Sequence, residues 1–164
     1  MIVVADTSPL NYLLQIGCES LLPALYGRVL MPPAVSAELN DPSTPPLVRQ
    51  WITQAPDWLE IRIIVSAPDS ELSFLGEGEQ QAIQLALERH ADLLLIDDRR
   101  GRAEADRRGI ATTGTLGVLL TSARRGLVDA EASYHRLMRE TNFRANAMVE
   151  ESFLRRLREI ERSR

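Results

Sequence analysis

The sequence predicts an α/β domain with a mostly parallel central sheet and a helical C-terminal region. Short apolar segments without alternation, which are typical of strands covered on both faces, occur at 2–5 and 93–96. Between and after them run segments with apolar residues three and four positions apart, as in amphipathic helices. Strands that alternate with helices favour a parallel sheet, and a length of 164 residues fits one domain.

The first half of the chain predicts strands that alternate with helices. We expect a strand at 2–5 and then a helix with Ser8 as its N-cap, Pro9 at its first position and Gly17 at its end. Further helices are expected at 19–26, 33–39 and 47–54, strands at 28–31 and 58–65, and a Pro-rich linker at 41–46. The strand at 58–65 begins with alternation of apolar and polar residues, which suits a sheet edge.

The second half predicts two more strands and a helical end. Apolar residues at 82, 83, 86 and 87 mark an amphipathic helix over 79–90. We expect strands at 93–96 and 110–112 and helices at 99–108, 116–125, 130–140 and 146–161.

Composition excludes several classes of protein. With 45% hydrophobic and 26% charged residues the chain is neither disordered nor fibrous. All 19 basic residues are arginine, which excludes a P-loop, a lysine Schiff base and a receiver-domain lysine. Cys18 is the single cysteine, so an internal disulfide and a thiolate zinc cluster are excluded too.

Charge and hydropathy bear on partners and location. A net charge of −4 excludes a wholly basic nucleic-acid binder but leaves room for a local basic surface. No apolar run approaches the length of a membrane span, and the first residues lack the basic character of a secretory signal. We therefore expect a cytoplasmic protein that does not enter a membrane.

Acidic residues follow two of the expected strands. Asp6 follows the first strand, and Asp97 and Asp98 follow the strand at 93–96; in open parallel sheets, functional groups gather at such carboxyl ends. Glu38 and Glu79, on neighbouring helices, are expected to join them. Carboxylates brought together repel one another unless a cation offsets their charge, and a hard divalent ion such as Mg²⁺ prefers oxygen ligands.

Each acid also has a plain structural interpretation. An acid after a strand is often a cap or turn residue, and Glu38 alone resembles a solvated helix residue. Glu77 and Glu79 are both favoured at a helix N-terminus; we favour Glu79 for the site because it begins the apolar series that faces the sheet.

The remaining polar and aromatic residues carry weaker signals. Arg99, Arg100 and Arg102 follow the acidic strand and are candidates to bind substrate phosphates, although ion pairs with Glu104 and Asp106 explain such arginines equally well. Four aromatic residues do not interleave with basic residues, so we expect core or interface packing rather than base stacking for Trp51, Trp58, Phe74 and Phe143. His90 and His135 are expected at the surface.

Four segments resemble the PIN-domain family, in particular the branch close to the VapC toxin ribonucleases. They are Val4-Ala5-Asp6-Thr7-Ser8-Pro9-Leu10, Pro32 to Glu38, Gly78 to Ala86 and Leu94 to Arg102, and the segments Gly114 to Leu120 and Gly126-Leu127 resemble that branch's C-terminal part. The resemblance covers residues 1–145, with 146–164 expected as a C-terminal helix packed on or extending from the same domain.

The resemblance implies a three-layer fold and a metal-dependent endoribonuclease, the toxin of a toxin-antitoxin system. It implies that Asp6, Glu79, Asp97 and Asp98 bind Mg²⁺ or Mn²⁺, that Glu38 completes the catalytic set, and that Ser8 supports it. RNA as substrate, a small antitoxin as partner and a homodimer are expected. Two features depart from the family pattern: Glu79 stands where aspartate is common, and Ile96-Asp97-Asp98 stands where Thr-x-Asp is common.

Two other functions remain open at this point. One is a catalytically inactive PIN-like interaction protein. The other is a phosphatase with Asp6 as nucleophile, which is weaker because position 8 is serine and not the second acid such sites carry.

Overall fold

Five short parallel strands form the central sheet of the computed structural model, which describes residues 1–164. The strands are β1 (Val3–Ala5), β2 (Val29–Met31), β3 (Leu59–Ile61), β4 (Leu93–Leu95) and β5 (Thr112–Thr113). Their order is β3-β2-β1-β4-β5, and Val4 lies opposite Leu30 on one side and Leu94 on the other. The predicted α/β fold with a parallel sheet is confirmed.

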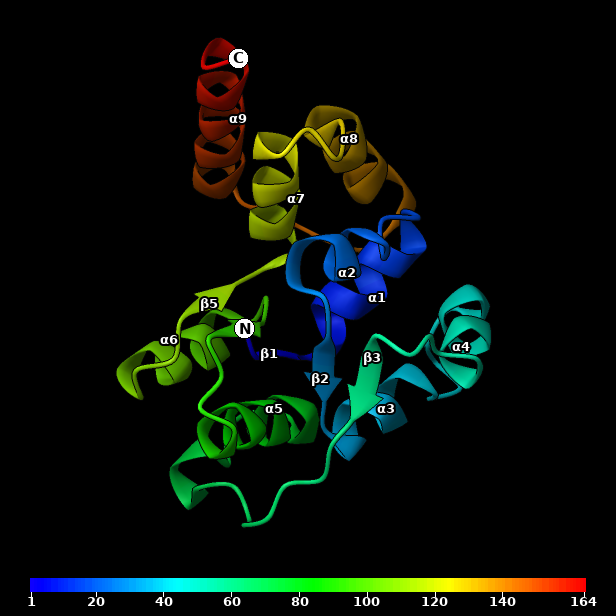
Figure 1. Cartoon of the computed structure of the whole chain (residues 1–164), viewed down its shortest axis with the longest axis vertical. Coiled ribbons are helices and arrows are strands. Elements are labelled where there is room, and N and C mark those ends of the chain that lie inside the picture. The colour runs from blue at the N-terminus through cyan, green and yellow to red at the C-terminus, as the bar shows by residue number, and fades with distance from the viewer.

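Nine α-helices and one 3₁₀ turn surround the sheet (Figure 1). They are α1 (Thr7–Gln15), α2 (Leu21–Tyr26), α3 (Pro33–Leu39), α4 (Pro46–Thr53), η1 (Ser70–Leu72), α5 (Glu77–Glu88), α6 (Arg99–Arg107), α7 (Thr115–Arg124), α8 (Ala130–Glu140) and α9 (Ala147–Arg162). Gly27 ends α2 with a φ of 74°, a conformation in which a side chain is strained.

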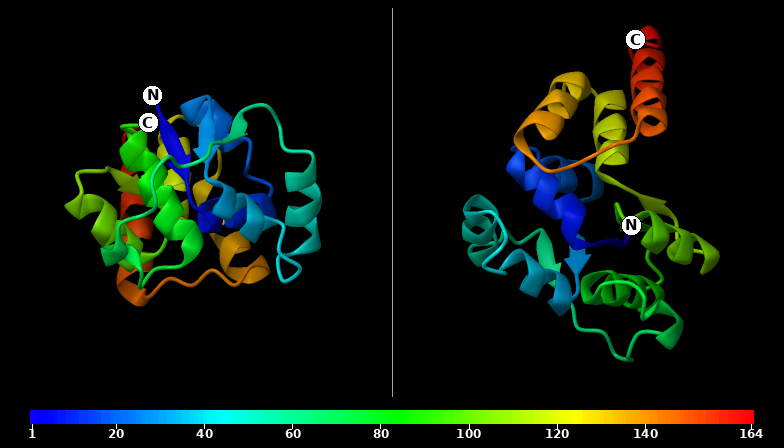
Figure 2. Two further views of the ribbon diagram at one scale, coloured as in Figure 1. Left: turned by 90° about the horizontal axis from the view of Figure 1, so that it is seen from below. Right: turned by 180° about the vertical axis from the view of Figure 1, so that it is seen from behind.

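The sheet separates two apolar cores, which makes three layers. Val3 and Ala5 of β1 face the larger core, built with α1 to α4 and α7 to α9, whereas Val4 faces the smaller core, built with α5 and α6. Successive strand residues point to opposite faces, so a strand covered on both sides is apolar throughout. Figures 1 and 2 show α5 and α6 on one side of the sheet and α1, α2 and α7 on the other.

The C-terminal helix packs on the helical layer and not on the sheet. Phe153, Leu157 and Ile160 of α9 are buried, and the Phe153 ring stacks on Tyr134 of α8 at 4.9 Å. The Asn146 side chain caps α9 by accepting a hydrogen bond from the Val149 amide at 2.9 Å. In Figure 1 this helix lies beside α7 at one end of the molecule. None of the helices combines the length and the apolar character that a membrane crossing requires.

Several predicted element boundaries differ from the structure. The helix expected over 79–90 spans Glu77–Glu88, and the strand expected over 110–112 spans Thr112–Thr113. Helix α1 begins at Thr7 with Asp6 in the N-cap position, so Ser8 is not its cap. The strand expected over 58–65 is limited to Leu59–Ile61, although β3 is an edge strand as predicted. Beyond it, the Val65 amide donates to the Glu88 carboxylate of α5 at 2.7 Å, which holds the chain away from the sheet. The segment 41–46 connects α3 to α4 within the fold.

The aromatic residues divide into packed and exposed ones. Trp51 and Trp58 contact each other at 5.8 Å against the larger core, and Phe143 is buried beside Tyr12, as expected. Phe74 is 46% exposed, so it is not packed in the core, and interface packing is the part of the expectation that is left for this residue. It lies between Leu72 and Leu75, which are both buried, and the chain cannot turn all three side chains inward.

Candidate active site

The predicted acids meet at the carboxyl edge of the two middle strands. Asp6 directly follows β1, and Asp97 and Asp98 follow the adjacent strand β4. The chain leaves β1 toward β2 on one side and returns to β4 on the other, and parallel α/β sheets commonly bind ligands at such a divergence of their connections. Helices α3 and α5 bring Glu38 and Glu79 to the same edge, where their charges act on Asp6.

Asp6 is the most buried of these acids. It is 2% exposed, and its Oδ1 atom has no hydrogen-bond partner. Burial, together with the nearby charges of Glu79, Glu38 and Asp97 and against the opposing effect of the Thr7 amide, raises the pKa of Asp6 to about 8. A buried, unpartnered carboxylate oxygen beside other acids is unfavourable unless a proton or a cation satisfies it.

Glu38 is held by two other elements. The Thr7 hydroxyl of α1 donates to its Oε2 atom, and the Gly78 amide in the first turn of α5 donates to its Oε1 atom at 3.1 Å. A Cβ atom at position 78 would lie 2.6 Å from both carboxylate oxygens, so a side chain there would displace the Glu38 carboxylate. Glu38 is therefore a fixed acid and not a solvated helix residue.

Asp97 is held by the N-terminus of α7. The Thr115 amide donates to Oδ1 and the Thr115 hydroxyl to Oδ2, both at 2.7 Å, and Thr115 is fully buried. A Cβ atom at position 114 would lie 2.5 Å from Asp97 Oδ1, so Gly114 keeps the space that this carboxylate occupies. Burial raises the pKa of Asp97, against the opposing effects of Thr115 and of the Arg102 charge.

Asp98 and Glu79 each bind a helix N-terminus as well. Asp98 caps α6, because its Oδ2 atom accepts a hydrogen bond from the Gly101 amide at 2.8 Å. Glu79 Oε2 accepts one from the Gly76 amide at 3.0 Å. Burial raises the pKa of Glu79, and the charges of Asp98 and Glu38 add to this effect. Glu77 is exposed, so the structure brings Glu79 and not Glu77 to the other acids.

Of the hydroxyl side chains near the acids, Ser8 makes no hydrogen bond, whereas Thr7 and Thr115 each bind an acid. Ser8 is partly buried and its side chain makes no hydrogen bond, whereas its neighbour Thr7 binds Glu38. Sequence reasoning missed Thr7 and Thr115. A signal for Thr115 was present, because Gly114 and Thr115 follow the last strand of the same parallel sheet and must lie near its carboxyl edge.

The arginines of α6 divide between the site and the helix surface. Arg99, Arg100 and Arg102 are exposed in the first turns of α6. Arg102 Nη1 lies 3.6 Å from the position of a Cβ atom on Gly114, next to Asp97. Further along the chain, Arg107 and Arg108 form ion pairs with Glu104. For these two arginines, ion pairing on the surface therefore applies and not phosphate binding.

The five acids offer the oxygen ligands that a hard divalent ion prefers, but their side chains are not arranged in a coordination geometry. As the side chains lie, no three of them form a group that could hold an ion. Both oxygens of Glu38 and of Asp97 accept hydrogen bonds, whereas Asp6 Oδ1 has no partner. Asp6 is thus the acid of the site with an oxygen left over for a cation, and carboxylate oxygens are what Mg²⁺ and Mn²⁺ prefer.

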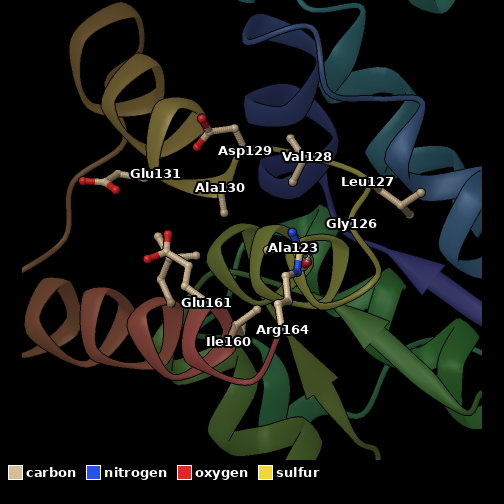
Figure 3. Close-up of a pocket in the computed structure, with 11 residues that line it drawn as sticks. Ala123, Gly126, Leu127, Val128, Asp129, Ala130, Glu131, Ile160, Glu161 and Arg164 are labelled. Atoms are coloured by element: carbon tan, nitrogen blue, oxygen red, sulfur yellow. Dashed lines mark hydrogen bonds between the residues drawn. The ribbon is translucent and has the colours of Figure 1, made fainter.

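Two hollows of the surface lie at different distances from this site. One of about 350 Å³ is lined by Glu38 and by Pro33, Ala34, Ala37, Asp41, Glu77 and Gln81. Another of about 550 Å³ lies where the α7–α8 connection meets the end of α9, and there the Arg164 guanidinium donates to the Ala123 carbonyl (Figure 3). The second hollow contains none of the predicted site residues.

Comparison with known proteins agrees with this architecture. A model of the DUF3368 family, described as a PIN domain, matches residues 2–159. A PilT N-terminus domain protein from the hyperthermophilic archaeon Sulfolobus solfataricus P2 has a similar fold, with a TM-score of 0.55 at 16% identity over 74% of this chain and 93% of that one. No curated protein sequence matches. The chain belongs to the PIN-domain family, whose members are generally nucleases.

Proposed function

We propose that this PIN-domain protein is an endoribonuclease that depends on Mg²⁺ or Mn²⁺. The observation that carries the proposal is Asp6, a buried acid with an unpartnered oxygen among the charges of Glu38, Glu79 and Asp97. A fold needs no such group for stability, because burying an unpaired carboxylate is costly. A divalent cation bound to Asp6 would offset that cost, and the carboxylate would then serve as a metal ligand.

Each acid has a distinct part in this proposal. Asp6 and Asp97, at the ends of adjacent strands, would hold the ion with Glu79 or Asp98 completing its shell, and Glu38 would orient a water that attacks phosphate. When bound, the ion lowers the pKa of that water and offsets the negative charge that develops at the attacked phosphate. Thr115 keeps Asp97 in place, and Thr7 with Gly78 keeps Glu38 in place.

The arginines of α6 supply the substrate contacts. Arg99 and Arg102 are exposed at the edge of the acidic group, and guanidinium groups bind phosphate oxygens in pairs. They offset the repulsion between the acids and a polyanionic RNA. We propose no nucleophilic side chain.

The test is hydrolysis of a labelled single-stranded RNA by purified protein. We expect cleavage with Mg²⁺ or Mn²⁺, none with EDTA, and none from Asp6→Asn in any buffer. Glu77→Gln is the matched control, because it removes an exposed acid from the same helix turn as Glu79; Glu77 lines the hollow beside Glu38 but makes no hydrogen bond to any of the five acids. Cleavage that persists in Asp6→Asn, or in excess EDTA, would contradict the proposal.

We further propose that the nuclease is the toxin of a toxin-antitoxin pair and forms a homodimer, on the strength of the sequence resemblance to the VapC branch. A small antitoxin would block the acidic site. Growth arrest on expression, relieved by Asp6→Asn, is the expected result. Unimpaired growth with active, well-expressed protein would contradict the toxin role and leave the nuclease proposal standing.

One observation favours a second candidate, an inactive interaction protein. Glu38, Glu79, Asp97 and Asp98 all accept hydrogen bonds from protein donors, so four of the five acids are satisfied without an ion. The same assay separates the two functions. Absence of both metal binding and cleavage in folded wild-type protein would favour the interaction protein.

A further inference from the structure

Phe74 is an exposed aromatic ring on a rigidly anchored segment. Leu72 at the end of η1 and Leu75 are buried in the smaller core, while Phe74 between them is 46% exposed. Two ion pairs tie the segment to α6: Arg108 with Asp69 at 3.3 Å and Arg107 with Glu71 at 3.2 Å. The ring therefore has a fixed position on the surface.

Arg100 lies over this ring. The centre of its guanidinium group is 5.3 Å from the ring centroid, a cation–π distance. Arg100 is on α6, the same helix that Arg107 and Arg108 join to the segment, so both partners of the contact sit on elements that are fastened together. Part of the ring remains open to solvent beside a positive charge.

The pair borders the carboxylate group. Two residues after Phe74, the Gly76 amide donates to Glu79 at 3.0 Å. On the other side, Arg100 lies two positions beyond Asp98, and its charge acts on Glu79, opposing the rise that burial causes in the pKa of that carboxyl. The ring and the guanidinium therefore stand at the edge of the site where the proposed function places the scissile phosphate.

We propose that Phe74 and Arg100 form a stacking platform for one unpaired base of a single-stranded RNA, next to the phosphate that is cleaved. This inference rests on the proposed nuclease function and names a binding site for its substrate. Aromatic rings and guanidinium planes both stack on bases, and they do so for any base because each has a π face. A positive charge over the ring attracts a polyanion to a protein whose net charge is −4.

The platform predicts what the enzyme selects. A paired base is stacked inside its duplex and cannot lie on Phe74, so duplex RNA is a poor ligand. Base identity at this position matters little, because the contact reads no hydrogen-bonding edge. An abasic nucleotide at this position removes the contact altogether.

The experiment measures binding apart from cleavage. Fluorescence anisotropy of an end-labelled single-stranded RNA is recorded with millimolar Mg²⁺ in the Asp6→Asn background, so that the probe stays intact. We expect Phe74→Leu to weaken binding roughly tenfold, since stacking on one aromatic residue contributes about 1–3 kcal/mol. Phe74→Trp should retain wild-type affinity, and Val65→Ala, which shortens another exposed apolar side chain, should change nothing.

A second measurement reports stacking itself. RNAs with single 2-aminopurine substitutions are scanned for the position whose fluorescence is quenched on binding, and Phe74→Leu should abolish that quenching. An abasic RNA at the same position should bind wild type and Phe74→Leu equally.

Three outcomes overturn the platform. The platform is refuted if Phe74→Leu binds RNA and quenches 2-aminopurine fluorescence as strongly as the protein with Phe74. If wild type still cleaves RNA, the nuclease proposal stays intact. A change in oligomeric state of Phe74→Leu, with RNA affinity unchanged, would show that the ring is a protein contact instead. Wild type that neither binds nor cleaves RNA would refute both proposals together.

Discussion

At the scale of single residues, the acids of the site differ in what holds them. Glu38, Glu79, Asp97 and Asp98 each accept a hydrogen bond from a backbone amide at or near the start of α5, α6 or α7. Helix N-termini carry free amides and a partial positive charge, so they stabilise carboxylates that would otherwise repel one another. Among the five acids of the site, Asp6 alone has a carboxylate oxygen that is buried and unpartnered; elsewhere in the molecule, Glu19 Oε2 is in the same state.

Replacement of Asp6 by asparagine tests this difference. Asp6→Asn keeps the side-chain volume and removes the buried charge, so the fold should persist and the metal-free melting temperature should rise. Metal affinity should fall roughly a hundredfold or more, since residues that merely orient a ligand already change it tenfold to a hundredfold. Calorimetric titration with Mn²⁺ measures this, and undiminished affinity would show that the metal lies elsewhere.

The raised pKa of Asp6 has a consequence for stability without metal. Because its pKa is 3.8 unfolded and about 8 folded, the folded state binds more protons between these values. The free energy of unfolding should therefore fall as pH rises from about 4 to 8, and Asp97 and Glu79, whose pKa values are also raised, act in the same direction. Urea unfolding in EDTA across this range checks the slope, which Asp6→Asn should flatten; an unchanged slope would contradict the assignment.

Thr115 is expected to position Asp97. Thr115→Val keeps the shape and the amide but removes the hydroxyl donor to Oδ2, so Asp97 should lose its fixed orientation. We expect about tenfold weaker Mn²⁺ binding and a loss of about 1–2 kcal/mol of stability. Thr121→Val, on the same helix and without a side-chain hydrogen bond, is the control. Equal metal affinity in the two variants would mean that Thr115 serves only the fold.

At the scale of elements, the rotation of α5 about its axis decides whether Glu77 or Glu79 faces the site. The helix begins at Glu77, and its buried residues Gly78, Ala82, Ile83 and Ala86 face the smaller core or Glu38. Glu79 lies at the third position, half-buried, with its carboxylate turned back to the Gly76 amide. Glu77 points to solvent.

Replacing each glutamate in turn tests which of the two serves the site. Glu79→Gln should weaken Mn²⁺ binding, because it removes a charge close to Asp98 and Glu38, whereas Glu77→Gln should leave affinity unchanged. Isothermal titration of both variants under one set of conditions gives the comparison. A greater loss from Glu77→Gln would reverse the assignment.

At the scale of the whole molecule, metal binding and stability are linked. Without a bound ion, the acids of the site repel one another and destabilise the fold. An ion that binds only the folded chain raises the free energy of unfolding by RT ln(1 + [L]/Kd). At about a hundred times Kd this is about 2.7 kcal/mol, or roughly 6–10 °C in melting temperature for a domain of this size. Sodium chloride at equal ionic strength should do less, because screening does not replace direct coordination.

The double variant Asp6→Asn with Asp97→Asn is the control for this increment. It should melt higher than wild type without metal and show no specific response to Mn²⁺. A double variant that melts lower than wild type, yet still responds to Mn²⁺, would show that both residues serve the fold alone.

Sequence patterns determined the order of the elements and the location of the acids. Apolar runs at 2–5 and 93–96 predicted the two middle strands, because a strand covered on both faces needs apolar residues throughout. The position of Asp6, Asp97 and Asp98 just after those strands then followed from the parallel order, which brings the carboxyl ends of all strands to one edge. These inferences use only local spacing, which the sequence contains in full.

Contacts between distant segments were decided by the tertiary structure alone. The bonds from Thr7 to Glu38 and from Thr115 to Asp97 join residues 31 and 18 positions apart, and no periodicity relates them. The exposure of Phe74 could not be predicted for this reason, because it depends on Leu72 and Leu75 filling the core and on Arg100 reaching the ring from another helix. Spacing along the chain predicts which face of an element is apolar, but which partner meets that face depends on packing the whole domain.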